Sequence, residues 1–249
     1  MQTTGNTILI TGGGSGIGRG FAEAFHAAGN HVVIAGRRRD ALEAVVAANP
    51  GMAFQQLDVD DPAAIRAFAA RVAAEHPALN VLVNNAGIMR AEPLLDDEFD
   101  LADADATIAT NLVGPIHLTA ALLPHLRRQP HAAVVNVTSG LAYVPRADTP
   151  TYSATKAAIR SYTESLRHQL RHTSVQVIEL APPLVATDLT PGQRANPRAM
   201  PLDDFVRESI ALLRADPDAT HVYVERVRFQ RDAEAEGRYA AAFATINPA

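Results

Sequence analysis

Three side chains in the second half of the chain have types and a spacing that suit proton transfer to an oxygen atom. Tyr152 and Lys156 are four residues apart, so they share one face if the segment is helical. A phenol has an unperturbed pKa of about 10, and a nearby ammonium lowers it by favouring the phenolate. We therefore expect Tyr152 to have a lowered pKa and to exchange a proton with a carbonyl or alcohol oxygen. Ser139 is expected to donate a hydrogen bond to the same oxygen.

A second pattern with chemical meaning is the stretch TILITGGGSGIGRG, in which an apolar run leads through glycines into a helical pattern. A helix N-terminus offers unpaired N–H groups and a partial positive charge, so it attracts phosphate. Glycines allow a tight turn and the close approach of a pyrophosphate. The fingerprint G-x-G-x-x-G fits in no register, and the spacing is instead Gly12-x-x-x-Gly16-x-Gly18 after Thr11. With its flanking strand and helix, the pattern favours a dinucleotide site over a simple tight turn.

This glycine spacing resembles the TGxxxGxG motif of the short-chain dehydrogenases/reductases. Further motifs of that family follow in order, from about Thr7 to Val224. They are NNAG at Asn84–Gly87, Asn111, Ser139 in VVNVTS, the pair Tyr152 and Lys156, and Pro182, Val185 and Thr187 after the sixth apolar run. One departure is Pro183, which stands where the family has glycine and which cannot donate a backbone hydrogen bond.

The resemblance implies a catalytic set and a cofactor site. The catalytic residues are Ser139, Tyr152, Lys156 and Asn111, with Lys156 also holding the nicotinamide ribose and Asn111 supporting a water-linked proton relay. The implied cofactor-binding residues are Gly12, Ser15, Gly16, Ile17, Gly18, Asp58, Val59, Asn84, Ala86, Gly87, Tyr152, Lys156, Pro182, Val185 and Thr187. No metal is expected, because the scattered histidines form no convincing ligand spacing.

The residues after the second apolar run bear on which dinucleotide is preferred. An Asp or Glu at that strand end would accept hydrogen bonds from a free ribose 2′-OH, but the position is Gly36. Arg37 and Arg38 follow, and a guanidinium can bind phosphate through two hydrogen bonds. We therefore expect a preference for NADP(H), with NAD(H) as the alternative and Arg37 at the 2′-phosphate. Asp40 is expected to neutralise part of this positive charge.

These residues are placed by a regular alternation of short apolar runs and longer helical patterns. The predicted strands are Thr7–Thr11, His31–Gly36, Met52–Leu57, Asn80–Asn84, Ala132–Ser139, Ser174–Ala181 and His221–Val224. Helical patterns include Ile17–Ala28, Arg38–Ala48 and Pro62–Glu75. The alternation predicts an α/β fold over residues 1–249, a single domain with a doubly wound parallel sheet of Rossmann type. The cofactor is expected at the carboxyl ends of the strands, beside the first.

Composition sets the remaining bounds. Of the 249 residues, 47% are hydrophobic and 20% are charged, which favours a large core over disorder. The formal charge of −5 gives no reason to expect nucleic acid or an anionic membrane as partner. The lack of cysteine excludes disulfides, thiolate zinc sites and a cysteine nucleophile. We find no secretory signal and no long apolar run, so we expect a cytoplasmic protein without a membrane span.

The expected activity is hydride transfer between a nicotinamide cofactor and a carbonyl or alcohol, as in alcohol dehydrogenases and carbonyl reductases. An apolar ketone or aldehyde is expected, because apolar residues would rim the pocket: Met89, Leu141, Tyr143, Val144, Leu184, Leu189 and Met200. The alternatives are a 3-oxoacyl-carrier reductase and a non-enzymatic dinucleotide sensor. An epimerase or dehydratase of the same fold is disfavoured, because only some 25 residues follow the last predicted strand.

Two segments lie outside this core pattern. Thr190–Pro201, TPGQRANPRAMP, has no periodic apolar face and is predicted to be a lid that orders when substrate and cofactor bind. Residues 225–249 form a tail that we expect to pack on a neighbouring subunit, in a homodimer or homotetramer.

Overall fold

The seven predicted strands pair as one parallel sheet. In the computed structural model, which describes residues 1–96 and 100–248, the strand order is β3-β2-β1-β4-β5-β6-β7. The strands are β1 Thr7–Thr11, β2 His31–Gly36, β3 Ala53–Gln56, β4 Leu79–Asn84, β5 Ala132–Val137, β6 Val175–Leu180 and β7 His221–Val222. The order reverses between β1 and β4, and ligands of such sheets bind at the carboxyl ends of the strands at this point. The predicted doubly wound fold is confirmed.

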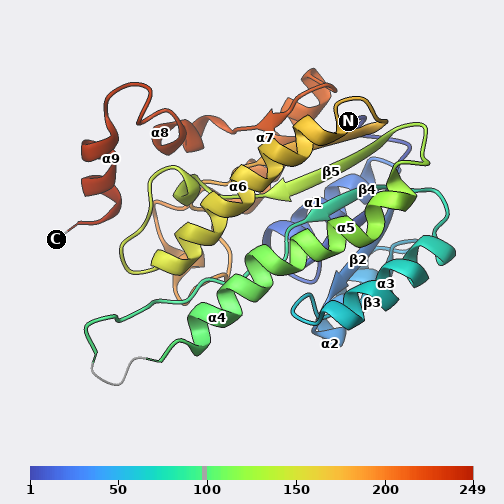
Figure 1. Ribbon diagram of the computed structural model, residues 1–249, viewed down its shortest axis with the longest axis horizontal. Coiled ribbons are helices and arrows are strands. Elements are labelled where there is room, and N and C mark those ends of the chain that lie inside the picture. The colour runs from blue at the N-terminus through green and yellow to red at the C-terminus, as the bar shows by residue number, and fades with distance from the viewer. Residues whose placement is uncertain (97–99, 249) are drawn as a thin grey trace.

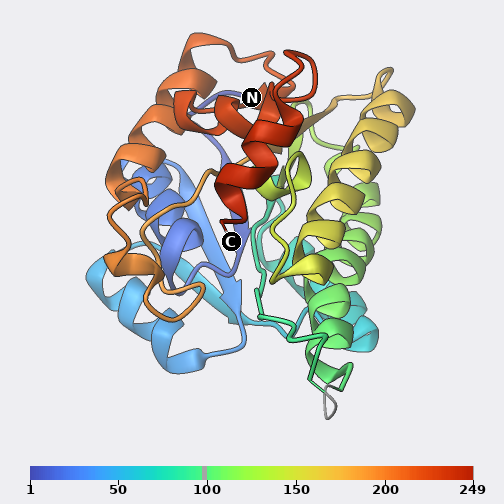
Figure 2. The same cartoon turned by 90° about the vertical axis from the view of Figure 1, so that its left-hand side faces the viewer.

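Helices cover both faces of the sheet (Figures 1 and 2). One face carries α1, α2 and α7, and the other carries α3, the continuous helix α4–α5, and α6. Their bounds are α1 Gly16–Ala27, α2 Arg39–Ala48, α3 Pro62–Glu75, α4 Ala102–Ile108, α5 Gly114–Leu126, α6 Pro150–Leu170 and α7 Leu202–Ala215. A π-helical turn, η1 Ala109–Val113, joins α4 to α5, and a short 3₁₀ turn, η2 Gly140–Ala142, follows β5.

The continuous apolar strands are explained by burial on both sides. Ile8 and Ile10 pack into the core that contains Phe21, whereas Leu9, between them, packs into the core that contains Phe68. Successive strand residues point to opposite faces, so a strand covered on both sides needs apolar residues at every position. The same reasoning placed the strands in the sequence, and their bounds differ from the predicted ones by two residues at most.

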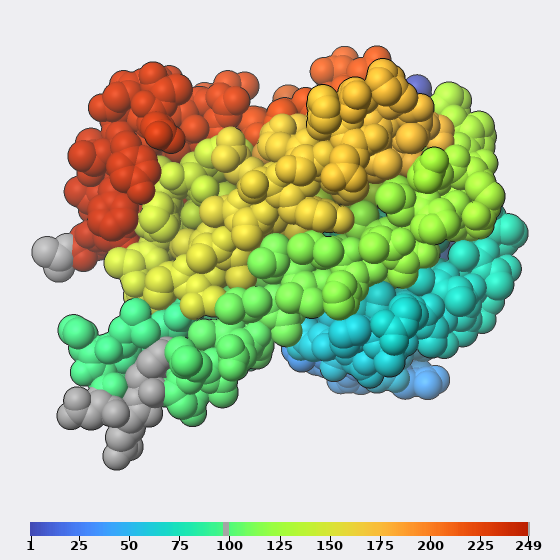
Figure 3. Space-filling model, viewed as in Figure 1, coloured from blue at the N-terminus to red at the C-terminus, as the bar shows by residue number. Residues whose placement is uncertain are grey.

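The helix from Ala102 to Leu126 is longer and more apolar than the sequence pattern indicated. By length and composition alone it is apolar enough to cross a membrane, and 44% of its most apolar window is buried. Polar residues such as Asn111 and Thr119 interrupt its apolar sequence. The helix lies beside α6 on one face of the molecule (Figure 3) and also packs against α3.

The tail after β7 folds back on its own chain. It forms η4 Glu225–Val227, α8 Arg228–Arg231 and α9 Tyr239–Ile246 (red in Figure 2). Val144, just after η2, packs with residues of the tail, and Asn247 Oδ1 accepts a hydrogen bond from Ala147 N at 2.6 Å. The tail therefore supports the segment that follows β5. Its contact with a second subunit stays a prediction, which light scattering of the full chain would test.

Candidate active site

A cavity of about 460 Å³ lies at the carboxyl ends of the strands and contains most of the predicted site residues. The predicted residues that line it are Gly12, Ser15, Gly16, Ile17, Arg37, Val59, Ala86, Gly87, Ser139, Tyr152, Lys156, Pro182, Val185 and Thr187. The predicted residues placed outside the lining are Gly18, Asp58, Asn84 and Asn111. The cavity thus brings the glycine turn, the arginines and the Ser139–Tyr152–Lys156 set to one surface.

The glycine turn leaves the backbone exposed to the cavity. Gly12 and Gly16 have φ angles of +68° and +53°, a region that favours glycine. A Cβ on Gly12 would lie 2.9 Å from Asn85 Nδ2. Gly18 has a different role, because a Cβ there would overlap the carbonyl oxygen of Gly12; it allows α1 to pack against the turn. The residues present therefore fit a pyrophosphate at the N-terminus of α1.

The two arginines after β2 both line the cavity but have different partners. Arg38 Nη2 donates to Ser15 Oγ at 3.1 Å, which places its guanidinium beside the glycine turn. Arg37 Nη1 lies 3.6 Å from Asp60 Oδ2, and Thr110 Oγ1 donates to the other oxygen of this carboxylate at 2.7 Å. Asp60, rather than the expected Asp40, therefore balances the charge of Arg37. The exposed Asp58 accepts a hydrogen bond from Asp60 N at 3.1 Å.

The two asparagines of the NNAG motif separate into a structural and a cavity residue. Asn84 Nδ2 donates to Asn136 Oδ1 at 2.8 Å and to Thr119 Oγ1 at 2.9 Å, so it joins β4 to β5 and α5. Asn85 lines the cavity, and its Nδ2 donates to Thr11 O at 2.9 Å. Asn84, predicted at the cofactor, thus has its side chain in the protein interior, and Asn85, which was not predicted, lines the cavity instead, because side chains alternate between faces at the end of a strand.

Asn111 supports the wall of the cavity from the π-helical turn η1. Its Oδ1 accepts from Ile88 N at 2.9 Å, and its Nδ2 donates to Ile88 O at 2.8 Å. A Cβ on Gly87 would lie 3.2 Å from Asn111 Oδ1 and 3.7 Å from Lys156 Nζ, so Asn111 and Lys156 flank the same glycine. Asn111 therefore fixes the backbone beside Lys156, while its part in a proton relay stays a prediction.

Ser139, Tyr152 and Lys156 are brought together by the end of β5 and the first two turns of α6. All three are buried. Ser139 caps η2, and its Oγ accepts a hydrogen bond from Leu141 N at 3.1 Å. Lys156 Nζ donates to the carbonyl oxygen of Val137 at 2.9 Å and lies 5.6 Å from the centre of the Tyr152 ring. The predicted shared helix face is confirmed.

Burial shifts the pKa values of Tyr152 and Lys156. It raises the pKa of Tyr152 to about 12, although a hydrogen bond with Ser139 acts in the opposite direction. Burial also lowers the pKa of Lys156 to about 8. The expectation of a lowered pKa for Tyr152 is therefore wrong for the chain without cofactor. The main cause is burial of the phenol, and no hydrogen bond from the Lys156 ammonium opposes it, because that ammonium donates to the carbonyl oxygen of Val137.

The segment after NNAG adds a charged residue to the cavity that sequence reasoning missed. This segment runs from Ile88, held by Asn111, to Glu92, whose carboxylate accepts from Thr151 N and Oγ1 at 2.9 and 2.7 Å. Thr151 precedes Tyr152, so the segment passes the end of the cavity that Tyr152 lines. Arg90 lies in it and lines the cavity, 3.6 Å from Asp103 Oδ1. The sequence does not indicate this position of Arg90, because it depends on the contact between Glu92 and Thr151, which lie far apart in the chain.

The expected apolar rim is mostly packed elsewhere. Of that set, Leu189 lines the cavity in the part of the chain that the structure describes. Tyr143 directs its hydroxyl to Glu179, and Val144 packs against the tail. Pro183, the departure from the family motif, does line the cavity.

The predicted lid, Thr190–Pro201, is attached near both ends. Gln193 lines the cavity and its Nε2 donates to Val185 O at 2.8 Å, while Met200 pairs with Val185 as an isolated bridge. Pro191, Gly192, Arg194 and Pro197 are exposed. Its ordering on ligand binding stays a prediction.

Comparison with known proteins agrees with this geometry. The family model described as short chain dehydrogenase matches residues 6–198. The uncharacterized oxidoreductase DltE of Bacillus subtilis is 45% identical over 194 residues, which are 78% of this chain and 77% of the relative. The NADP-dependent 3-hydroxy acid dehydrogenase YdfG of Shigella flexneri is 33% identical and covers 72% of each chain.

Solved structures extend the likeness to the whole fold. A short chain dehydrogenase from Burkholderia cenocepacia in complex with NADP matches with a TM-score of 0.82 and 26% identity, over 97% of this chain and 98% of that one. The closed form of serine dehydrogenase with NADP⁺ matches with a TM-score of 0.77 and 28% identity, over 87% and 92%. With its glycine turn and its Ser139–Tyr152–Lys156 set, this chain belongs to the short-chain dehydrogenase/reductase family of oxidoreductases.

Proposed function

We propose that the chain is an NADP(H)-dependent oxidoreductase that interconverts a carbonyl compound and the corresponding alcohol, as carbonyl reductases and alcohol dehydrogenases do. The observation that carries the proposal is one cavity with Arg37 and Arg38 at its β2 end and Ser139, Tyr152 and Lys156 at its β5 end. The nicotinamide cofactor would supply the hydride chemistry. The residues of the chain would bind the cofactor, orient the substrate against it and transfer the proton.

The raised pKa of Tyr152 favours a role for this residue as a proton donor. With a pKa of about 12 it carries its proton at neutral pH, so it can deliver that proton to a carbonyl oxygen as negative charge develops there. Ser139 supplies a hydrogen bond to the same oxygen. For oxidation of an alcohol, Tyr152 must first lose its proton, which requires a positive charge nearby to lower its pKa. These properties support Tyr152 as the proton donor of the carbonyl-reducing step.

The preference for NADP(H) is supported by the residues at the β2 end. Gly36 offers no carboxylate to a ribose 2′-OH, and Arg38 lies beside Ser15 at the glycine turn. Two of the similar solved structures hold NADP, and YdfG is named as NADP-dependent. The guanidinium of Arg37 is paired with the carboxylate of Asp60, so we expect Arg38 to contribute more to binding of the 2′-phosphate.

Matched variants test this assignment. We expect kcat/KM to be higher with NADPH than with NADH for the unmodified chain. Arg38→Ala should lower it with NADPH by about tenfold or more, the scale of a charge-assisted hydrogen-bond pair, and leave NADH nearly unaffected. Arg37→Ala is the control, with a smaller loss. A higher efficiency with NADH would contradict the cofactor assignment and leave the carbonyl chemistry intact.

For the substrate we propose an apolar ketone or aldehyde, because Ile88, Pro183 and Leu189 line the cavity. Arg90 favours a second candidate, a substrate with a carboxylate near its carbonyl or hydroxyl group, since a guanidinium binds carboxylates. YdfG, named as a 3-hydroxy acid dehydrogenase, supports this second candidate.

Paired substrates separate the two candidates. A ketone and the 3-oxo acid of equal chain length would be compared on the unmodified chain and on Arg90→Met. If Arg90 binds a carboxylate, the variant loses activity on the acid alone, through a higher KM. Equal losses on both compounds would exclude that role. The 3-oxoacyl-carrier alternative would be tested in the same panel with a 3-oxoacyl thioester.

A further inference from the structure

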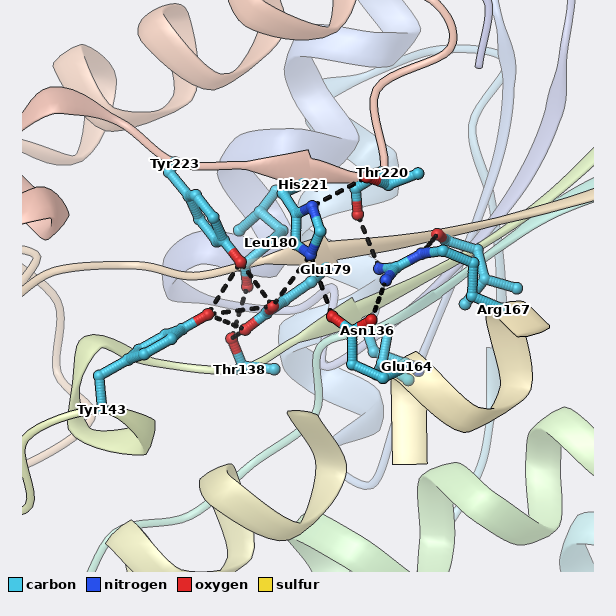
Figure 4. A network of polar contacts seen from close by, with 12 residues as sticks. Asn136, Thr138, Tyr143, Glu164, Arg167, Glu179, Leu180, Thr220, His221 and Tyr223 are labelled. Atoms are coloured by element: carbon cyan, nitrogen blue, oxygen red, sulfur yellow. Dashed lines mark hydrogen bonds and ion pairs between the residues drawn. The ribbon is translucent and has the colours of Figure 1, made fainter. Parts of the chain in front are cut away.

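Glu179, on β6, is a fully buried carboxylate that the proposed mechanism does not use (Figure 4). It accepts hydrogen bonds from three hydroxyl groups. Thr138 Oγ1 donates at 2.7 Å, Tyr143 OH lies 3.0 and 3.1 Å from the two oxygens, and Tyr223 OH donates at 2.7 Å. The two phenols are also 2.8 Å from each other. Burying a carboxylate is costly unless hydrogen-bond donors satisfy its oxygens. The positions of these three hydroxyl groups relative to Glu179 are therefore strongly constrained.

Three nitrogen-bearing side chains lie at the edges of this cluster. His221 Nε2 lies 3.9 Å from the carboxylate. Arg160 stacks on the Tyr143 ring at 4.6 Å and Arg231 stacks on the Tyr223 ring at 5.2 Å. Burial raises the pKa of both phenols, and the charge of Glu179 adds to this effect, so they remain protonated donors.

A cation site at the same place is disfavoured by the donors already present. Ligand atoms of Glu164, Glu179 and His221 lie within 4.8 Å of one another. However, Arg167 Nη1 donates to Glu164 at 2.6 Å, and the hydroxyls occupy both oxygens of Glu179. Proton donors therefore fill the positions that a metal ion would need.

Two of the three donors lie on either side of the catalytic serine. Thr138 immediately precedes Ser139, and Tyr143 follows it by four residues, at the end of η2. The backbone adds to this attachment, because Thr138 N donates to Leu180 O at 2.9 Å and Gly140 N donates to Pro182 O at 2.8 Å. Tyr223, the third donor, comes from the segment after β7 and is not part of the turn that carries Ser139.

We propose that Glu179 is a positioning residue for Ser139: by binding Thr138 and Tyr143 it clamps both ends of the turn that aims the Ser139 hydroxyl at the reacting oxygen. The inference rests on the proposed reaction, in which Ser139 contacts the substrate. A loss of this clamp leaves the glycine turn untouched, so it should affect the chemical step and spare cofactor binding.

The first test compares two tyrosine variants that remove the same group. Tyr143→Phe and Tyr223→Phe each delete one phenol hydroxyl from Glu179, but only Tyr143 belongs to the serine turn. We expect Tyr143→Phe to lower kcat about tenfold, within the range for misplaced catalytic groups, with an unchanged dissociation constant for NADPH. Tyr223→Phe should stay within about threefold of the unmodified chain. Equal effects of the two variants would overturn the proposal.

The second test asks whether Glu179 acts through Ser139. Glu179→Gln keeps the shape of the side chain and removes its charge, and it should lower kcat by at least tenfold in the unmodified chain. In a Ser139→Ala background the same change should lower kcat by less than about threefold, because the group being positioned is absent. The same factor in both backgrounds would show a merely structural role and overturn the proposal.

A readout without turnover separates this inference from the proposed function. Hydrogen exchange of the peptide that covers residues 138–144 should accelerate in Glu179→Gln and Tyr143→Phe but not in Tyr223→Phe. If the unmodified chain reduces no carbonyl compound, the proposed function fails, and unchanged exchange in this peptide would separately refute the clamp. Should Glu179→Gln fail to fold, Tyr143→Phe decides the question alone.

Discussion

Lys156 offers a sensitive test of the site's electrostatics, because it is the sole lysine in the sequence. Burial lowers its pKa from 10.5 to about 8, and its ammonium donates to the carbonyl of Val137. Replacing it in Lys156→Met removes the ionisable group from the buried site. The variant should change the pH dependence of folding in a direction and size that follow from this pKa.

The sign follows from proton binding in the two states. Below pH 8 Lys156 is charged in both the folded and the unfolded chain, and the penalty of burying the charge is fully present. Between about pH 8 and 10.5 the unfolded chain binds a proton that the folded chain does not, so the free energy of unfolding rises with pH. At about 1.4 kcal/mol per pKa unit, the rise from pH 7 to pH 9.5 is about 2 kcal/mol.

Urea unfolding at both pH values measures this rise. From pH 7 to pH 9.5, the free energy of unfolding of the unmodified chain should rise by about 2 kcal/mol more than that of Lys156→Met. The comparison cancels the titration of all other groups, which both chains share. Lys156→Arg is the control: its guanidinium stays charged throughout, so it also lacks the rise and is less stable than Lys156→Met. With ¹³C-labelled lysine, the single side-chain resonance should titrate near pH 8. Parallel pH responses of all three chains, or a midpoint near 10.5, would refute the assigned burial penalty.

Two variants and one hydrogen-exchange measurement test the other parts of the site. Tyr152→Phe should lower kcat by about a hundredfold or more and leave NADPH affinity nearly unchanged, and a near-normal kcat would remove Tyr152 from the mechanism. Gly18→Ala should destabilise the chain and weaken NADPH binding, because its Cβ would overlap Gly12 O; unchanged thermal unfolding would contradict this packing role. Hydrogen exchange in Thr190–Pro201 should slow when NADPH and an alcohol product are bound, whereas equally strong protection in the free protein would show a rigid loop without a gating role.

Much of the fold followed from periodicity and local signals. The helical pattern over Pro62–Glu75 has the same bounds as α3, whose N-terminus is capped by Asp61 Oδ1 accepting from Ala63 N at 2.8 Å. The continuous apolar runs gave the seven strands because each is buried on both faces. The spacing of Tyr152 and Lys156 gave their common face, since four residues make about one turn of helix.

The remaining features depend on residues that meet only in the folded chain. Asp60 reaches Arg37 across two loops, and Glu179 meets Thr138 and Tyr143 from 41 and 36 positions away. The direction of the pKa shift of Tyr152 was predicted wrongly, because the sequence places an ammonium nearby but does not show that the phenol is buried and that the ammonium donates to Val137 instead. Tyr143 was assigned to the substrate rim as an apolar residue, although its hydroxyl is bound to a buried carboxylate.

Transfer of deuterium from labelled NADPH tests most directly whether the protein transfers a hydride with proton donation from Tyr152. The protein would be incubated with NADPH that carries deuterium at the transferring position of the nicotinamide and with a panel of ketones, aldehydes and 3-oxo acids. We expect a product alcohol with one deuterium on the carbinol carbon, formed at least about a hundredfold more slowly by Tyr152→Phe at equal cofactor occupancy. Failure to label any product, or equal rates for the two chains, would contradict this mechanism.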